Sequence, residues 1–227
     1  MNIVLIAGLW LDARAWDAVL QPLEDLGHRP RALTLPGQGD GATSATLDQQ
    51  LAAVLAAVDA TPERLVVVAH SAACSLAWMA ADARPDKMAS LVLIGGFPAA
   101  DGEVYADLFP PQDGLMGFPG WEPFEGPDSD DLDEDTKHRI AAGAIPVPEG
   151  VTKAVVHLSD DRRYAVPTVL VCPEFTPADA RAWIDAGDLP ELAKATHLEL
   201  VDLDSGHWPM FSTPAELARV LDEASTS

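Results

Sequence analysis

Short apolar segments rich in β-branched residues alternate with helical patterns along most of this chain, and this alternation strongly constrains the fold. A strand that is covered on both faces reads as a continuous apolar run. Such runs predict buried strands at residues 3–7, 31–35, 65–69, 91–94, 168–172 and 197–201. Helical periodicity occupies residues 14–26, 47–58, 74–83, 178–186 and 215–221. We therefore expect an α/β fold with a mostly parallel sheet of about six strands and helices on both faces.

The alternation stops between residues 97 and 165, a stretch that we call the insertion. Proline, glycine and acidic residues dominate it, and helical periodicity returns only at residues 134–142. Aromatic residues recur within it, at Tyr105, Phe109, Phe118, Trp121 and Phe124. This pattern favours a lid over an apolar pocket, with an acidic surface excursion as the alternative. We expect a single domain over residues 1–227, with residues 97–165 as its cap and residues 128–135 as a solvated, mobile charge run.

The composition argues against several classes of partner. The chain has 36 acidic and 14 basic residues, and its formal net charge of -22 repels phosphate backbones and anionic lipids alike. We therefore expect neither nucleic acid nor a membrane as a partner. The two cysteines, Cys74 and Cys172, lie in apolar stretches and indicate no disulfide framework. The first apolar run is too short for a signal or membrane segment, so a cytoplasmic location is expected.

Ser71 lies where a predicted strand passes through a small-residue turn directly into a helix. Residues 65–73 read Leu-Val-Val-Val-Ala-His-Ser-Ala-Ala. A nucleophile elbow has this context and requires small residues two positions before and after the serine, which here are Ala69 and Ala73. The alternative is that the serine only caps the helix. We interpret Ser71 as the candidate nucleophile and expect His70 to pack structurally.

His207 follows the last predicted strand and precedes the last predicted helix, in the sequence Ser-Gly-His-Trp. The carboxyl ends of parallel strands share one edge of a sheet, so Ser71 and His207 are expected to meet there. The order serine then histidine is the one found with nucleophile elbows. His207 is therefore the candidate general base.

An oxyanion hole needs two backbone N–H groups beside the nucleophile. Ala72 follows the serine, and Leu9 lies in the loop after the first strand, where Gly8 permits a close approach. Trp10 and Trp208 flank these loops and are expected to contact substrate, whereas Trp16 is expected in the core. No pair of histidines or cysteines has the spacing of metal ligands, so neither a metal nor a cofactor is expected.

These motifs together resemble the α/β-hydrolase superfamily over nearly the whole chain. They are Ala7–Trp10 with Trp16, Leu35–Gly39, His70-Ser71, Phe97-Pro98 and Gly206–Trp208. Residues 26–28 and 32–35 resemble the branch that contains plant methylesterases, hydroxynitrile lyases and bacterial esterase-like relatives. The resemblance implies six strands with a cap after the fourth. Hydroxynitrile lyases of this branch carry threonine where Gly8 stands and lysine where Trp208 stands, so cyanohydrin cleavage is disfavoured.

The acid of the expected triad is ambiguous in the sequence. The resemblance places it a few residues after the strand that ends at Cys172, and that register points to Thr176, which has no carboxylate. Glu174 is the first choice, because its longer side chain compensates for a shortened loop. The remaining alternatives are Asp179, which suits the first turn of a helix, and Asp101 or Glu103 beyond the fourth strand.

The leading functional hypothesis is hydrolysis of carboxylic esters or lactones of small to medium, hydrophobic substrates through an acyl-enzyme. The alternatives are a non-hydrolytic enzyme of lyase or cofactor-free oxygenase type, and a catalytically weak ligand-binding protein. Fold alone does not select among them, and the sequence leaves the substrate and oligomeric state open.

Overall fold

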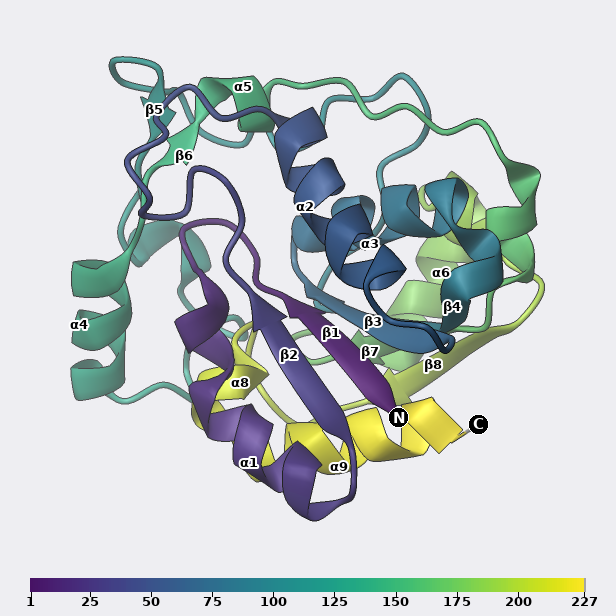
Figure 1. Ribbon diagram of the computed structural model, residues 1–227. Coiled ribbons are helices and arrows are strands. Elements are labelled where there is room, and N and C mark those ends of the chain that lie inside the picture. Colours follow the sequence, from purple (N-terminus) through teal and green to yellow (C-terminus); the bar gives the residue numbers. More distant parts are fainter. Residues whose placement is uncertain (227) are drawn as a thin grey trace.

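The computed structural model describes residues 1–226 and has a parallel six-stranded sheet at its centre (Figure 1). The strand order is β2-β1-β3-β4-β7-β8, and every neighbouring pair is parallel. The strands are β1 (Asn2–Ile6), β2 (Arg29–Leu33), β3 (Leu65–His70), β4 (Met88–Ile94), β7 (Thr168–Cys172) and β8 (Leu198–Asp202). The predicted sheet is confirmed, with the largest shift in β4, which begins at Met88 rather than Leu91.

Helices cover both faces of this sheet, as predicted (Figure 1). Successive residues of a strand point to opposite faces. Along β3, Val67 and Ala69 therefore join one apolar cluster, and Val66 and Val68 join the other. The first cluster includes residues of α2 (Leu47–Asp59), α3 (Ala73–Ala83) and α6 (Pro177–Ala186), and the second those of α1 (Asp17–Asp25) and α9 (Pro214–Thr226).

The first predicted helix, residues 14–26, is shorter in the structure. A 3₁₀ turn, η1 (Ala13–Trp16), comes first, and α1 begins only at Asp17. The carboxylate of Asp12 accepts the backbone N–H of Arg14 and so starts this tighter turn. Trp16 is completely buried in the core, as expected. The helical periodicity predicted for residues 14–26 therefore spans a 3₁₀ helix followed by an α-helix.

The insertion leaves the sheet after β4 and returns at β7, its neighbour in the sheet. It contains β5 (Leu115–Met116), η3 (Glu122–Phe124), α4 (Glu134–Gly143), β6 (Val147–Pro148), α5 (Glu149–Thr152) and η4 (Asp161–Ala165). β5 and β6 form a small antiparallel pair. Short elements elsewhere are η2 (Pro85–Lys87), α7 (Pro190–Ala193) and α8 (Pro209–Ser212).

The acidic stretch 128–135 is more than a charge run. Ser129 is buried, and the carboxylate of Asp133 accepts the backbone N–H of Thr136 at 2.7 Å, which caps α4. The carboxylate of Asp131 accepts the backbone N–H of Gly206 at 2.7 Å. Asp131 and Asp133 are exposed, as expected for a solvated run, but their carboxylates have structural partners within the chain, so the expectation of a mere charge run is wrong for them.

A buried ionic cluster connects the end of the insertion to α3 and α7. Arg163 is 4% exposed and lies 3.0 Å from Asp82 of α3 and 2.9 Å from Glu191 of α7. Trp78 donates a further hydrogen bond of 2.9 Å to Glu191. Burial by itself raises the pKa of Glu191, but the hydrogen bonds from Trp78 and Arg163 outweigh burial and lower it. Arg163 thus supplies a positive charge between two buried carboxylates.

None of the helices within residues 1–226 combines the length and apolar character that crossing a bilayer requires.

Candidate active site

Ser71 lies at the tip of a sharp turn between β3 and α3. Its φ of +56° is in the left-handed region, which non-glycine residues rarely adopt. The turn is held by a hydrogen bond of 2.8 Å from the Ser71 N–H to the carbonyl of Ile94. Gly96 packs against this turn so closely that a Cβ there would lie 2.4 Å from the Ser71 carbonyl oxygen. The strand, strained turn and helix are thus arranged as an elbow, which presents the serine side chain at the carboxyl edge of the sheet.

Ser71, His207 and Glu174 form a continuous chain of side-chain contacts. The distance from Ser71 Oγ to His207 Nε2 is 3.0 Å, and His207 Nδ1 donates to Glu174 Oε1 at 2.7 Å. The side chains of His207 and Glu174 are 15% and 14% exposed. The three residues follow β3, β8 and β7, and they meet because those strands end at one edge of the sheet.

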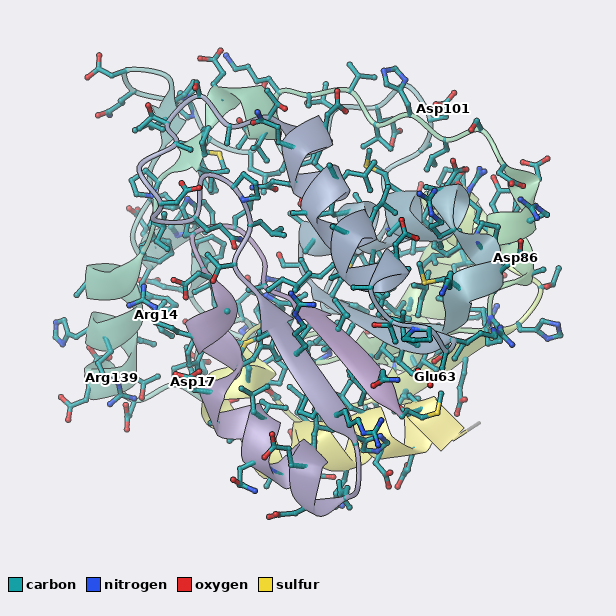
Figure 2. The ribbon with its side chains drawn as sticks, in the orientation of Figure 1. Arg14, Asp17, Glu63, Asp86, Asp101 and Arg139 are labelled. Carbon is teal, nitrogen blue, oxygen red and sulfur yellow. The ribbon has the colours of Figure 1, made fainter. Side chains whose placement is uncertain are left out.

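The other candidate acids have partners of their own. Asp179 forms a capping box with Thr176 at the start of α6, and hydrogen bonds from Thr176 lower the pKa of its carboxyl. Asp101 accepts the backbone N–H of Leu158 and lies on the outer part of the insertion (Figure 2). Glu103 accepts the N–H of Ala100 at 2.8 Å. Among the four candidates, Glu174 is the one that contacts the imidazole of His207.

The two proposed oxyanion donors lie beside Ser71. Neither the Leu9 nor the Ala72 backbone N–H has a hydrogen-bond acceptor within residues 1–226, so both remain available. Gly8 brings the loop after β1 against the elbow, since a Cβ there would lie 2.9 Å from His70 Nδ1 and 3.0 Å from Ser71 Cβ. A side chain at this position would separate the loop from the serine. The arrangement is that of two free N–H donors next to the side chain of Ser71.

His70 supports the loop that carries His207. It is completely buried, and its Nε2 donates to the backbone carbonyl of His207 at 2.7 Å, with the two rings 4.8 Å apart. Burial, and secondarily the neighbouring His207, lowers the pKa of His70 well below its ordinary 6.5. A neutral ring that packs structurally agrees with the sequence interpretation. Its partner was not predictable, because the contact joins positions 137 residues apart and depends on the path of the His207 loop.

Trp10 and Trp208 connect the site to the insertion. Trp10 donates to the carbonyl of Met116 and packs against Phe118 and Phe124 at ring distances of 5.4 and 6.0 Å. Trp208 packs against Phe124 at 5.3 Å and against the His207 ring at 4.8 Å. The aromatic side chains of the insertion therefore lie over the loops of the site. This favours the lid interpretation over that of an acidic surface excursion.

A small cavity of about 20 Å³ lies behind the loop after β1, lined in part by Gly8, Leu9, Trp10 and Tyr105. That volume is close to the space one water molecule requires. Ser71 and His207 do not line it. The cavity is therefore too small for an organic substrate.

Two further observations concern titratable side chains. Within residues 1–226, no group of three or more His, Cys, Asp or Glu side chains is placed to hold a metal ion. His28 is buried and lies 2.8 Å from Asp222 of α9. His28 immediately precedes β2 and therefore lies at the amino edge of the parallel sheet, opposite the edge at which Ser71 lies.

Comparisons with known proteins find similarity over nearly the whole chain. Methylesterase 7 of Arabidopsis thaliana is 28% identical over 254 residues, which cover 97% of this chain and 94% of that protein. An extracellular α/β-hydrolase from a Paenibacillus species has a TM-score of 0.80 at 17% identity, and the match covers 99% of this chain and 98% of that chain. That hydrolase is described as sharing structural and functional homology with tobacco salicylic acid binding protein 2. Methylesterase MES16 from Arabidopsis has a TM-score of 0.78 at 16% identity. The match covers 100% of this chain and 99% of that protein.

The model of the alpha/beta hydrolase family matches residues 3–220. The match includes the elbow, the insertion and the loop of His207. The chain therefore belongs to the alpha/beta hydrolase family.

Proposed function

We propose that this protein is a serine hydrolase of carboxylic esters or lactones, with Ser71 as nucleophile, His207 as general base and Glu174 as the triad acid. The observation that carries the proposal is the unbroken chain of contacts from Ser71 Oγ through the imidazole to Glu174 Oε1. The likeness to methylesterases supports an ester as the substrate. The residues around the serine supply each function that acyl transfer requires.

The contacts suggest how the reaction proceeds. Glu174 accepts a hydrogen bond from the Nδ1–H group of His207, so that the Nε2 lone pair faces the Ser71 hydroxyl. His207 Nε2 removes the proton of the Ser71 hydroxyl as Ser71 attacks the carbonyl, and the N–H groups of Leu9 and Ala72 stabilise the oxyanion. The imidazolium then protonates the leaving alcohol, and an acyl-enzyme forms. Water attacks this ester with His207 again as base, which releases the acid and restores the serine.

The surroundings of Ser71 favour a small to medium, hydrophobic substrate. Trp10 and Trp208, with the aromatic residues of the insertion, offer apolar contacts beside the site. The formal net charge of -22 disfavours an anionic substrate. We infer a single hydrolase domain with the insertion as its cap. The free cysteines Cys74 and Cys172, both buried, support a reducing, cytoplasmic setting.

Covalent labelling of Ser71 tests this function. A fluorophosphonate should label the wild-type protein, and p-nitrophenyl esters of short acyl chains should be hydrolysed. Both activities should disappear in Ser71→Ala and fall strongly in His207→Ala. Ser44→Ala and His138→Ala, at exposed positions elsewhere, are the matched controls and should behave as wild type. A folded wild-type protein that neither reacts with the probe nor turns over any ester would contradict the proposal and favour a ligand-binding role.

A further inference from the structure

The loop that carries His207 is hydrogen-bonded to the insertion as well as to His70 at the end of β3. The His207 N–H donates to the carbonyl of Asp128 at 2.8 Å, and the Gly206 N–H donates to the carboxylate of Asp131 at 2.7 Å. Ser205 Oγ donates to the same carboxylate at 3.1 Å. These three bonds run from consecutive residues of the loop to one short turn, residues 126–132, which we call the acidic turn.

Gly206 shows how closely the two segments fit. A Cβ at this position would lie 2.4 Å from both the carbonyl oxygen of Asp128 and Oδ1 of Asp131. Real side chains do not tolerate such approaches, so the glycine is required by the contact with the acidic turn. The glycine before the histidine therefore has a specific role here, which is to let the insertion dock on the loop.

The acidic turn is stabilised by its own bonds and does not depend on the loop for its shape. The N–H groups of Ser129 and Asp130 both donate to the carbonyl of Gly126 at 3.0 Å. Ser129 Oγ donates to the carbonyl of Phe124 at 2.7 Å, and Leu132 is buried in the apolar cluster that includes α1 and α9. A turn anchored in this way can act as a rigid support.

We propose that Asp131 is a positioning residue that holds the backbone of His207 in place for catalysis and thereby couples the insertion to the general base. The inference rests on the proposed function. Glu174 restrains the imidazole ring, whereas the backbone of His207 is held by His70 at its carbonyl and by the acidic turn at its N–H. A base that must lie within hydrogen-bond distance of Ser71 loses efficiency when its backbone moves by a fraction of an ångström.

The carboxylate of Asp131 is the part of this support that depends on the side chain. The bond from His207 to Asp128 uses a main-chain carbonyl, which any residue at that position supplies. The bonds from Gly206 and Ser205 require an acceptor on the side chain of residue 131, and an ionised acceptor makes them stronger. Displacement of the insertion would withdraw all three bonds together, so the position of the cap and that of the base are linked.

Kinetic comparison of three variants tests the role of Asp131. Asp131→Ala should lower kcat for a p-nitrophenyl ester by up to about 10²-fold with a smaller change in KM, because the base is displaced while the aromatic residues beside Ser71 remain in place. Asp131→Asn keeps an acceptor oxygen and should recover most of the loss. Asp130→Ala removes the same charge from the neighbouring exposed residue, whose side chain has no hydrogen bond or ion pair within residues 1–226, and should match wild type.

A double-mutant cycle separates positioning from a merely structural role. If Asp131 acts through His207, Asp131→Ala should not lower further the residual rate of His207→Ala. If the two losses multiply, or if Asp131→Ala has the kcat of wild type, the proposal is overturned. Thermal unfolding of each variant identifies any loss of folded protein. If the alanine variant does not fold, Asp131→Leu, which has a similar shape but no acceptor oxygen, provides the test.

Hydrogen exchange distinguishes failure of this inference from failure of the proposed function. Even if the protein hydrolyses no ester, the backbone amides of Gly206 and His207 should exchange faster in Asp131→Ala than in wild type and Asp130→Ala. Equal exchange rates in all three proteins would remove the structural basis of the inference, whatever the activity. Faster exchange with no hydrolysis by wild type would instead contradict only the proposed function.

Discussion

Glu174 Oε1 lies 2.7 Å from His207 Nδ1, although Glu174 is only two residues beyond the end of β7. The family resemblance points to position 176 for an acid, and Thr176 instead caps α6. The longer glutamate side chain spans the distance that a longer loop would otherwise cover. Gly95 allows this approach, since a Cβ there would lie 3.1 Å from Glu174 Oε2 and 3.2 Å from His207 Nδ1.

Glu174→Gln should lower kcat by about 10⁴-fold, because a neutral amide neither selects the correct imidazole tautomer nor stabilises the imidazolium. Steady-state hydrolysis of a p-nitrophenyl ester measures the effect. Asp179→Asn is the matched control, since Asp179 belongs to a helix cap, and its activity should stay at the wild-type level. The opposite result, a large loss in Asp179→Asn with little change in Glu174→Gln, would reassign the acid.

Gly8→Ala should lower kcat by about 10²-fold, the effect of losing one oxyanion donor. The added Cβ would lie 2.9 Å from His70 Nδ1, so the loop must move and carry the Leu9 N–H away from Ser71. Gly143→Ala is the control, because a Cβ there has no neighbour within 4 Å. Unchanged activity in Gly8→Ala would show that Leu9 is not an oxyanion donor.

The buried His70 should make stability depend on pH below neutrality. Burial lowers its folded-state pKa, so the unfolded chain binds a proton that the folded protein does not. The corresponding stability is complete above the unfolded pKa of about 6.5 and is lost as the pH falls towards the folded value. His70 contributes a slope of at most about 1.4 kcal/mol per pH unit between pH 6.5 and 5. Urea unfolding at several pH values should show a shallower dependence in His70→Gln; identical slopes would refute this assignment.

Arg163→Met should destabilise the protein by about 3–5 kcal/mol, because it removes the buried positive charge that lies between the carboxylates of Asp82 and Glu191. Arg162→Met is a neighbouring control. Arg162 is 62% exposed and pairs with Asp86 at the periphery of the molecule (Figure 2), so its loss should cost about 0–1 kcal/mol. Urea unfolding of both variants measures the difference. Similar values for the two arginines would mean that the buried cluster contributes no more than a surface pair.

Hydrophobic patterning and local turn chemistry determined much of this protein without tertiary information. The strands could be located because buried segments are apolar over their whole length, and the elbow at Ser71 because a strand, a small-residue turn and a helix are adjacent in sequence. The meeting of Ser71 with His207 also followed, since parallel strands bring their carboxyl ends to one edge. These features depend on neighbouring residues or on a general property of sheets.

Only the tertiary structure decided which carboxylate contacts His207 and how the insertion packs. The choice of Glu174 depends on the path of a loop, and the acidic turn docks on Gly206 through contacts between residues 75 positions apart. Charged residues near such contacts have the same local pattern as solvated ones, so Asp131 and Asp130 are indistinguishable in sequence. Distant side chains are brought together only when the chain has folded, and local periodicity contains no information about that pairing.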